Sequence, residues 1–551
     1  MASKTFSIFL FSLLTVFWAG SDQIHARQYT LQDTLRGTVT EERAWWDLSY
    51  YHLSVKVNIS DSSISGSNEI QYIVLEPYQT MQVDLQEPLE ISGIIQSGRE
   101  LDFRREGSAY FVKLEEEQKV GEVRELTVHY SGKPKVAVRP PWDGGFTWTE
   151  DSNGKPFVAT SNQGIGASVW WPNKDHPYDE PDSMLISITA PDSLMDVSNG
   201  RLRAVDDAGN GTKTWHWFVS NPINNYGVNI NIGDYVHFSE KYEGEKGTLD
   251  LDYYVLRENE EKAREQFKQV KPMMDAFEHW FGPYPFYEDG YKLVEAPYLG
   301  MEHQSSVTYG NGYQNGYLGR DLSGSGWGMK FDFIIIHETG HEWFANNITY
   351  ADVADMWVHE GFTNYSESLY LDYHHGEVAA NEYVQGLRFG IQNDRPLIGT
   401  YEVNQRGSND MYNKGGNLLH TLRQVVDNDS LWRETLRGLN REFYHQTVTS
   451  NEVEDYISDK LEMDLTPFFD QYLRDTRIPI LEYAFRDAQL MYRWVNTVSG
   501  FSMPVDVTVN GKEVRLNPTT TLNNLDVDEV DEPRLVLDQN YYAGSFNLLG
   551  E

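Results

Sequence analysis

Two histidines and two glutamates stand close together in this chain, at a spacing that suits metal chemistry. His337 and His341 lie four residues apart, and Glu360 follows the second histidine by nineteen residues. On an α-helix, residues four apart lie about 40° apart around the axis and about 6 Å along it, so both imidazoles can face one tetrahedral ion. Glu338 then lies beside the ion, where its carboxylate is free to accept a proton from a water molecule at the metal. The pattern predicts a hydrolase site with one Zn²⁺ per chain, in which Glu360 supplies the third ligand from a second helix.

The surrounding sequence favours helices for both metal-binding segments. Residues 331–336 are mostly apolar, and no proline occurs between them and a point well beyond Glu360. Both segments can therefore be helical. The alternative is that His337 and His341 are two structural histidines at the edge of a core.

Length and composition restrict the class of protein. The 551 residues are enough for two to four domains with sizeable cores. A hydrophobic content of 40% and an aromatic content of 13% exclude general disorder. The formal net charge of −38 argues against nucleic acid and anionic membrane surfaces as partners.

Residues 1–26 have the character of a signal peptide. Lys4 precedes the apolar run Phe6 to Trp18, and small residues follow. The run is shorter than the ~20 residues needed to span a bilayer, so we expect cleavage after Ser21 or Ala26 and no membrane span afterwards. The protein is therefore expected to be exported, to a periplasm or out of the cell. It contains no cysteine, so it has no disulfides.

The remaining chain divides by pattern into three regions. Residues 27–245 mostly alternate apolar and polar side chains, as in Leu53 to Ile59, which predicts a β-sheet domain. Residues 246–477 have helical spacing, and we expect Pro272 to kink the first helix and Pro467 to break the last. Residues 478–551 return to strands, with a predicted hairpin that turns at Asn510-Gly511.

Several motifs resemble those of the aminopeptidase N family of zinc metallopeptidases, which also includes leukotriene hydrolase. The resemblance implies a multidomain α+β fold: an N-terminal β saddle, a thermolysin-like, mainly helical catalytic domain and a small C-terminal β-sandwich. It covers most of the chain. The motifs are His337-Glu338-x-x-His341 with Glu360, Phe281-Gly282-x-Tyr284-Pro285, Gly300-Met301-Glu302, Tyr412-Asn413-Lys414-Gly415 and Phe468-Phe469-Asp470-Gln471-Tyr472-Leu473.

The resemblance also implies roles for individual residues. Gly300, Met301 and Glu302 are expected to bind the peptide substrate, with Glu302 on its free α-amine. Tyr412 is expected to donate a hydrogen bond to the tetrahedral oxygen during hydrolysis. Gln163 is a candidate for a second contact with the amine. Together these roles imply a zinc aminopeptidase that hydrolyses peptides with a free N-terminus.

The sequence departs from the family pattern at two sites, and it ends early. His303 stands where the family usually has asparagine, and we expect it to alter the orientation of Glu302 or the charge near it. The segment Asn162 to Gly166 is two residues shorter than its family counterpart. The chain is expected to be a short member without the large helical C-terminal domain, and its oligomeric state cannot be read from the sequence.

Two rival functions share these residues. A zinc endopeptidase of thermolysin type would use the same ligands and Glu338 but would not need Glu302. A non-catalytic peptide-binding protein on the same fold would be indicated by loss of a metal ligand or of Glu338, and all of these residues are present. We further expect the second ring nitrogens of the ligand histidines to find acceptors near the second helix, with Glu367 and Asp355 as candidates. Trp170-Trp171 and the glycine-rich stretch 309–328 either line a pocket or fold a loop.

Overall fold

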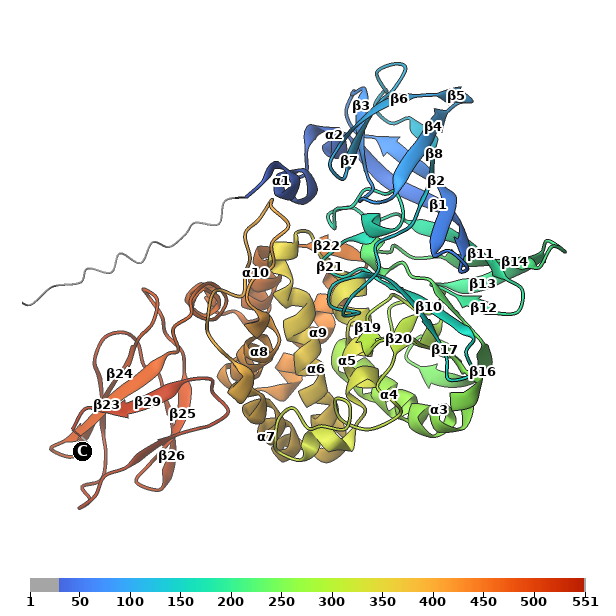
Figure 1. Cartoon of the computed structure of the whole chain (residues 1–551). Helices are drawn as coiled ribbons and strands as arrows, with labels where there is room; N and C mark the ends of the chain where they lie inside the picture. Colours follow the sequence, from blue (N-terminus) through green and yellow to red (C-terminus); the bar gives the residue numbers. More distant parts are fainter. Residues whose placement is uncertain (1–28, 550–551) are drawn as a thin grey trace, which may run out of the picture.

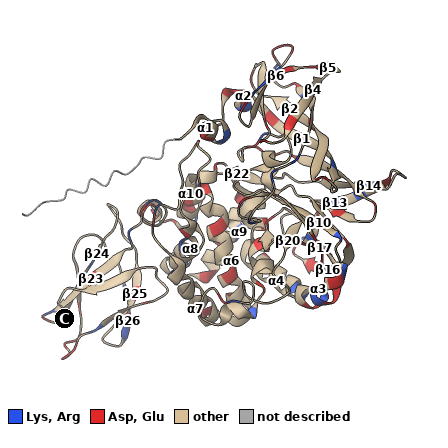
Figure 2. Cartoon of the chain, viewed as in Figure 1, with Lys and Arg blue, Asp and Glu red and all other residues tan. Residues whose placement is uncertain are grey.

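The computed structural model describes residues 29–549, so the predicted signal peptide lies outside the described residues. Figure 1 shows a β-rich N-terminal region, a helical middle region and a C-terminal region of β-sheets. The predicted multidomain α+β fold is confirmed at this level. In the described range, no helix is long and apolar enough to cross a membrane. Acidic side chains are spread over all three regions (Figure 2).

An eight-stranded sheet dominates the N-terminal region. Its longest strand, β1, pairs antiparallel with β2 and parallel with β11. Alternate residues of β1, such as Leu53, Val55 and Val57, are buried, as the period-two pattern predicts. In spatial order the strands are β13 (Arg201–Asp207), β14 (Thr212–Val219), β11 (Ser183–Pro191), β1 (Trp46–Asn58), β2 (Ser63–Val74), β8 (Val123–Gly132), β4 (Glu90–Gln96) and β5 (Arg99–Glu100).

Two smaller sheets share a core with the large one. That core includes Trp170 and Trp171, which are fully buried and therefore fold the region rather than line a pocket. Strand β10 ends immediately before Asn162-Gln163 and so brings Gln163 to the edge of the helical region. The strands are β12 (Met195–Val197), β15 (Asn231–Gly233), β10 (Pro156–Ser161) and β9 (Gly145–Glu150) in one sheet, and β3 (Thr80–Asp84), β7 (Ala109–Lys113) and β6 (Asp102–Glu106) in the other.

A five-stranded sheet joins the N-terminal region to the helices. Residue 245, where the sequence pattern ends the N-terminal domain, lies in the turn of the first hairpin of this sheet, and the two strands of that hairpin pair along their whole length. The edge strand β19 carries Gly300 and Met301 and lies beside helix α5 (Figure 1). The order is β16 (Tyr235–Gly244), β17 (Gly247–Leu256), β18 (Tyr291–Glu295), β20 (Val307–Tyr309) and β19 (Gly300–Met301).

The middle region is helical, as expected, and packs around α6. The first predicted helix is interrupted by a 3₁₀ turn at Phe267–Gln269, just before Pro272, because the proline ring cannot accept helical geometry in the turn that precedes it. Two short helices, α1 (Leu31–Gly37) and α2 (Glu41–Ala44), precede β1 in the N-terminal region. The helices of the middle region are α3 (Glu260–Gln266), α4 (Val270–Phe281), α5 (Phe333–Gly340), α6 (Trp357–His375), α7 (Glu377–Leu387), α8 (Asn413–Val426), α9 (Asp429–Glu442), α10 (Ser450–Leu461) and α11 (Thr466–Phe469), and β21 (Ile348–Tyr350) pairs with β22 (Gln446–Val448).

The end of this region follows the proline prediction as well. Helix α10 ends at Leu461, and Pro467 is the second residue of the short helix α11, where a missing N–H costs little. Leu461 and Phe469 belong to a core that continues into the C-terminal sheets. The C-terminal region therefore packs directly on the helices.

The C-terminal region consists of two small sheets. The predicted hairpin is confirmed: Asn510 and Gly511 have φ angles of 50° and 83°, the left-handed values that a tight primed turn requires. The first sheet has the order β27 (Asn523–Asp526), β24 (Gln489–Val495), β23 (Ile480–Arg486) and β29 (Gly544–Asn547), and the second β26 (Lys512–Leu516), β25 (Val505–Val509) and β28 (Leu535–Leu537).

Candidate metal centre

Helices α5 and α6 position the predicted metal ligands. The side chain of Asp332 caps the start of α5 by accepting hydrogen bonds from the N–H groups of Ile334 and Ile335, at 3.1 and 3.4 Å. The helix ends at Gly340, where α6 comes very close: a Cβ atom there would lie 2.7 Å from Ser366 Oγ. His341 follows in helical conformation. The missing side chain of Gly340 therefore allows the two ligand-bearing helices to approach.

The three predicted ligands lie together and are almost completely buried. Glu360 Oε2 lies 3.4 Å from His341 Nε2 and 3.8 Å from His337 Nε2. Bonds of about 2.0–2.1 Å to a tetrahedral zinc ion would separate its ligand atoms by about 3.3 Å, close to these distances. Glu360 Oε2 has no hydrogen-bond donor among residues 29–549, so it is available to a cation. The donor set fits Zn²⁺.

A second partner fixes the orientation of each imidazole. His337 Nδ1 donates to Glu367 Oε1 at 2.8 Å, and His341 Nδ1 donates to the carbonyl of Phe344 at 3.0 Å. Because both partners are hydrogen-bond acceptors, each Nδ1 must carry the hydrogen. The Nε2 of each histidine is then unprotonated, and its lone pair can bind the metal. Of the two acceptors expected from the sequence, Glu367 is found in contact, whereas Asp355 is not.

Asp355 does not contact a ligand histidine because its carboxylate has other partners. It accepts hydrogen bonds from the hydroxyls of Tyr401 and Ser450, away from the histidines. The backbone carbonyl of Phe344 takes the role expected of a carboxylate, with Thr363 Oγ1 also 3.0 Å from His341 Nδ1. A carbonyl acceptor leaves no signal in residue types, so sequence reasoning could not have found it.

The carboxylate of Glu338 lies beside the ligands rather than among them. Its side chain is buried, and this burial raises the pKa of Glu338 to about 7. Gly300 on β19 provides the space: a Cβ at that position would lie 2.8 Å from Glu338 Oε1. A carboxyl group with a pKa near neutrality can both accept and return a proton, which suits general acid–base chemistry.

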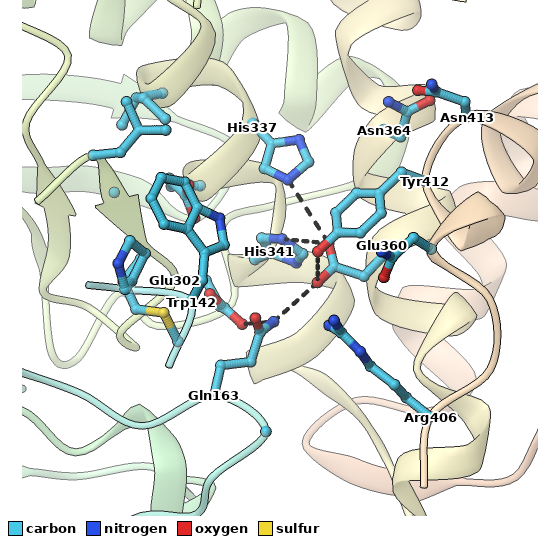
Figure 3. Close-up of a pocket in the computed structure, with 18 of the residues that line it drawn as sticks. Trp142, Gln163, Glu302, His337, His341, Glu360, Asn364, Arg406, Tyr412 and Asn413 are labelled. Atoms are coloured by element: carbon cyan, nitrogen blue, oxygen red, sulfur yellow. Dashed lines mark hydrogen bonds and ion pairs between the residues drawn. The ribbon is translucent and has the colours of Figure 1, made fainter. Parts of the chain in front are cut away.

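Glu302 and Gln163 meet at one end of the site, although they come from different regions of the fold (Figure 3). Gln163 Nε2 donates to Glu302 Oε1 at 2.7 Å and to Glu360 Oε1 at 2.9 Å. Burial raises the pKa of Glu302, whose backbone carbonyl also accepts a hydrogen bond from Asn346. The two predicted amine contacts therefore lie side by side, next to a predicted zinc ligand.

Tyr412 approaches the site from the segment just before α8. Its hydroxyl donates to Glu360 Oε1 at 2.9 Å (Figure 3). Burial and the charge of Glu360 hold the pKa of Tyr412 well above its usual value. The phenol consequently stays protonated and is available as a hydrogen-bond donor.

His303 and Met301 flank Glu302 differently. Met301 is buried at the lining of the cavity. His303 is fully buried, and burial lowers its pKa to about 3, so it is neutral and does not change the charge near Glu302 at neutral pH. Of the two effects expected of His303, the altered charge is wrong because the side chain is shielded from water, and the altered orientation of Glu302 stays a prediction.

A cavity of about 740 Å³ lies between the N-terminal and helical regions, and all the predicted site residues line it: Gln163, Gly300, Met301, Glu302, His337, Glu338, His341, Glu360 and Tyr412. Tyr317 and Leu322, from the glycine-rich stretch, contribute to it, so that stretch lines the pocket in part. Among the lining residues that sequence reasoning missed are Trp142, which is 66% exposed, and Arg406. Trp142 lies in a Pro-Pro-Trp-Asp-Gly-Gly turn, an unusual place for an aromatic side chain and the one signal that could have indicated it.

The site is a group of side chains that fits one zinc ion, and the comparisons identify the family. The Peptidase M1 N-terminal domain matches residues 48–226, and the Peptidase family M1 domain matches residues 265–472. This chain belongs to the M1 peptidase family.

Individual relatives are distant. Endoplasmic reticulum aminopeptidase 1 of Mus musculus is 21% identical over 54% of this chain and 33% of its own length. The probable aminopeptidase 1 of Sulfurisphaera tokodaii is 20% identical over 78% of this chain and 54% of its own length. The chain thus spans about half or less of the curated relatives that it matches.

A solved structure with a similar fold is matched over more of its own length than these curated relatives are. A variant of the M1 zinc metallopeptidase from Deinococcus radiodurans, bound to a Tyr-Ser-Ala substrate, is similar with a TM-score of 0.65 and 20% identity. The match covers 79% of this chain and 95% of that one.

Proposed function

We propose that this protein is a zinc-dependent aminopeptidase that removes N-terminal residues from peptides. The observation that carries the proposal is the hydrogen-bonded pair of Gln163 and Glu302, held directly against the zinc ligand Glu360. An acidic and an amide side chain at this position provide a recognition site for one ammonium group. Fixing that group fixes which peptide bond reaches the metal.

The amine-binding end works through two oxygens. Gln163 Nε2 is occupied by the two glutamates, which leaves Gln163 Oε1 free to accept from the substrate ammonium. The carboxylate of Glu302 supplies the charge. Its burial strengthens the ion pair with an ammonium because little water competes.

Hydrolysis itself uses Glu338 and Tyr412. Bound Zn²⁺ supplies Lewis-acid chemistry, which polarises the scissile carbonyl and makes water more acidic. Glu338 accepts the proton of the attacking water and later delivers it to the departing nitrogen, which its pKa of about 7 favours. Without substrate, the hydroxyl of Tyr412 donates to Glu360 Oε1. During hydrolysis it would donate to the carbonyl oxygen of the scissile bond as that oxygen gains negative charge.

The decisive experiment compares aminoacyl anilides offered with a free and with an acetylated amine. We expect the zinc-loaded protein to cleave only the free-amine set and to lose activity on chelation. Cleavage of the acetylated set at a similar rate would instead indicate an endopeptidase, and cleavage of neither set would indicate a peptide-binding protein.

We also propose that the protein is exported, to a periplasm or out of the cell. The proposal rests on the apolar run and small residues within residues 1–26. N-terminal sequencing of the protein from fractionated cells tests it. We expect a chain that begins after Ser21 or Ala26 outside the cytoplasm, and an intact N-terminus inside would contradict this.

A further inference from the structure

Residues 395–413 form a polar wall of the cavity. The polar side chains that this wall contributes are Arg395, Asn404, Gln405, Arg406, Asn409 and Asn413. Figure 3 shows Arg406 pointing into the pocket on the side of Glu360 and Tyr412. Its charge is within electrostatic reach of the Tyr412 hydroxyl. The guanidinium therefore faces the part of the cavity that Glu360 and Tyr412 line.

The two arginines of this wall have different surroundings. Arg395 Nη2 donates to the carbonyl of Gly407 at 3.0 Å and so helps to hold the loop. Arg406 is exposed and forms no hydrogen bond or ion pair with any of residues 29–549. Its donors are free for a ligand.

The loop that carries Arg406 is well supported. The N–H of Thr400 donates to the carbonyl of Gln405 at 3.2 Å, and the N–H of Ser408 donates to the carbonyl of Pro396 at 2.9 Å. From the N-terminal segment, Thr38 Oγ1 donates to the carbonyl of Glu402 at 2.8 Å. These contacts fix the backbone on both sides of Arg406, so its position at the cavity is a feature of the fold.

The charge pattern of the chain makes this free cation informative. The chain has 83 acidic and 45 basic residues, so acidic partners for an arginine are abundant. Three acids that line the cavity already have other partners: Glu302 bonds Gln163, Glu360 bonds Gln163 and Tyr412, and Asp143 accepts from the backbone N–H groups of residues 138 and 139. A guanidinium presents a planar fork of donors that matches a carboxylate in two parallel hydrogen bonds.

We propose that Arg406 binds a carboxylate of the peptide substrate and makes this site selective for peptides that carry one near the scissile bond. The inference rests on the proposed aminopeptidase function and specifies its substrate class. The carboxylate has two sources in a short peptide: an acidic side chain next to the scissile bond, or the C-terminal carboxylate of a dipeptide or tripeptide.

Two matched substrate pairs separate these sources. The first compares Glu-anilide with Gln-anilide, which tests an acidic side chain. The second compares Leu-Gly-Gly with its C-terminal amide, which tests the terminal carboxylate. Each is measured as a ratio of kcat/KM within the pair, for the zinc-loaded full chain and for the variants Arg406→Gln and Arg406→Lys.

For at least one pair we expect the native chain to prefer the carboxylate. Arg406→Gln should lower that ratio about 10- to 100-fold, the usual range for a hydrogen-bonded charge pair. Arg406→Lys should retain part of the preference because it keeps the charge but not the fork. Arg203→Gln, which removes an equal charge from the exposed face of β13, should keep the native ratio. Ratios near one for both pairs in the native chain, or an unchanged ratio in Arg406→Gln, would overturn the proposal.

A binding measurement keeps this test separate from the proposed activity. The zinc-loaded Glu338→Gln variant is titrated with Leu-Gly-Gly, its amide and Leu-Glu-amide in a calorimeter, with and without Arg406→Gln. Weaker binding of a carboxylate-bearing peptide only when Arg406 is replaced supports the inference even if no substrate is turned over. Equal binding of the three peptides in both backgrounds refutes it.

Discussion

The two walls of the cavity differ in how they are built. The metal-binding wall consists of α5 and α6, with every ligand buried and each imidazole fixed by a second partner. The wall at residues 395–413 is a loop with polar, partly exposed side chains, of which Arg406 is free. In the proposed function the first wall holds the metal, and in our further inference the second wall binds a carboxylate of the substrate. We therefore expect substitutions in the first wall to remove activity. In the second wall, we expect the same of Tyr412, which contacts Glu360, and a change of selectivity from substitutions of the polar loop side chains.

Replacing Glu338 should give the largest effect in the metal-binding wall. Glu338→Gln keeps the shape of the side chain but removes the proton acceptor, so we expect kcat to fall about 10³-fold or more. The variant should retain one zinc per chain because Glu338 is not a ligand, as metal analysis can determine. Loss of zinc from this variant would contradict the assignment of Glu338 as a residue beside the zinc ligands rather than a ligand itself.

Tyr412→Phe tests the hydrogen bond to the developing oxyanion. We expect kcat to fall about 10²- to 10³-fold while KM changes little, because the contact strengthens only in the transition state. Steady-state kinetics on a free-amine anilide measure both parameters. A rise in KM with unchanged kcat would mean that Tyr412 binds substrate in its ground state instead.

Glu302→Gln removes the charge that orients the substrate amine. We expect kcat/KM for free-amine substrates to fall about 100-fold, from loss of a charge-assisted pair and of orientation. The matched control is Glu452→Gln, at an exposed acid of α10 that should leave kinetics as in the native chain. Native kinetics in Glu302→Gln would exclude its role as the amine contact.

Glu367→Gln weakens the partner of a metal ligand rather than the ligand itself. The amide is a poorer acceptor for His337 Nδ1, so we expect zinc affinity to fall about 10- to 100-fold. Competition with a chelator of known affinity measures this. Zinc-saturated activity should recover most of the native rate, and failure to recover at saturating zinc would point to a wider structural role.

His303→Asn gives the smallest effect and appears in the pH dependence of stability. Burial lowers the folded-state pKa of His303 to about 3, against about 6.5 when unfolded, so the unfolded chain binds an extra proton between these values. The native free energy of unfolding therefore falls as pH drops below about 6.5. Between pH 6.5 and 5.5, the free energy of unfolding measured by urea denaturation should fall less in the variant than in the native chain, by up to about 1 kcal/mol. His374→Asn, at an exposed histidine, is the control, and equal losses in both variants would contradict the assignment.

The same contrast explains what the sequence could predict. His337, His341 and Glu360 are readable because helical spacing dictates where their side chains point, and the strands and the Asn510-Gly511 hairpin follow equally local rules. The meeting of Gln163 with Glu302 depends on packing between two regions, so only the family resemblance suggested it. Arg406 lies in an irregular loop without periodicity, and its position at the cavity cannot be derived from local pattern.

The central claim is that one zinc ion at His337, His341 and Glu360 makes this chain an aminopeptidase. Its most direct test is a titration of the metal-free chain with zinc, in which metal content and hydrolysis of a free-amine and an acetylated anilide are followed together. The account predicts that activity rises in proportion to bound zinc, reaches its plateau at one ion per chain and appears only with the free amine. Activity that is independent of zinc, or equal for the acetylated substrate at the plateau, would contradict it.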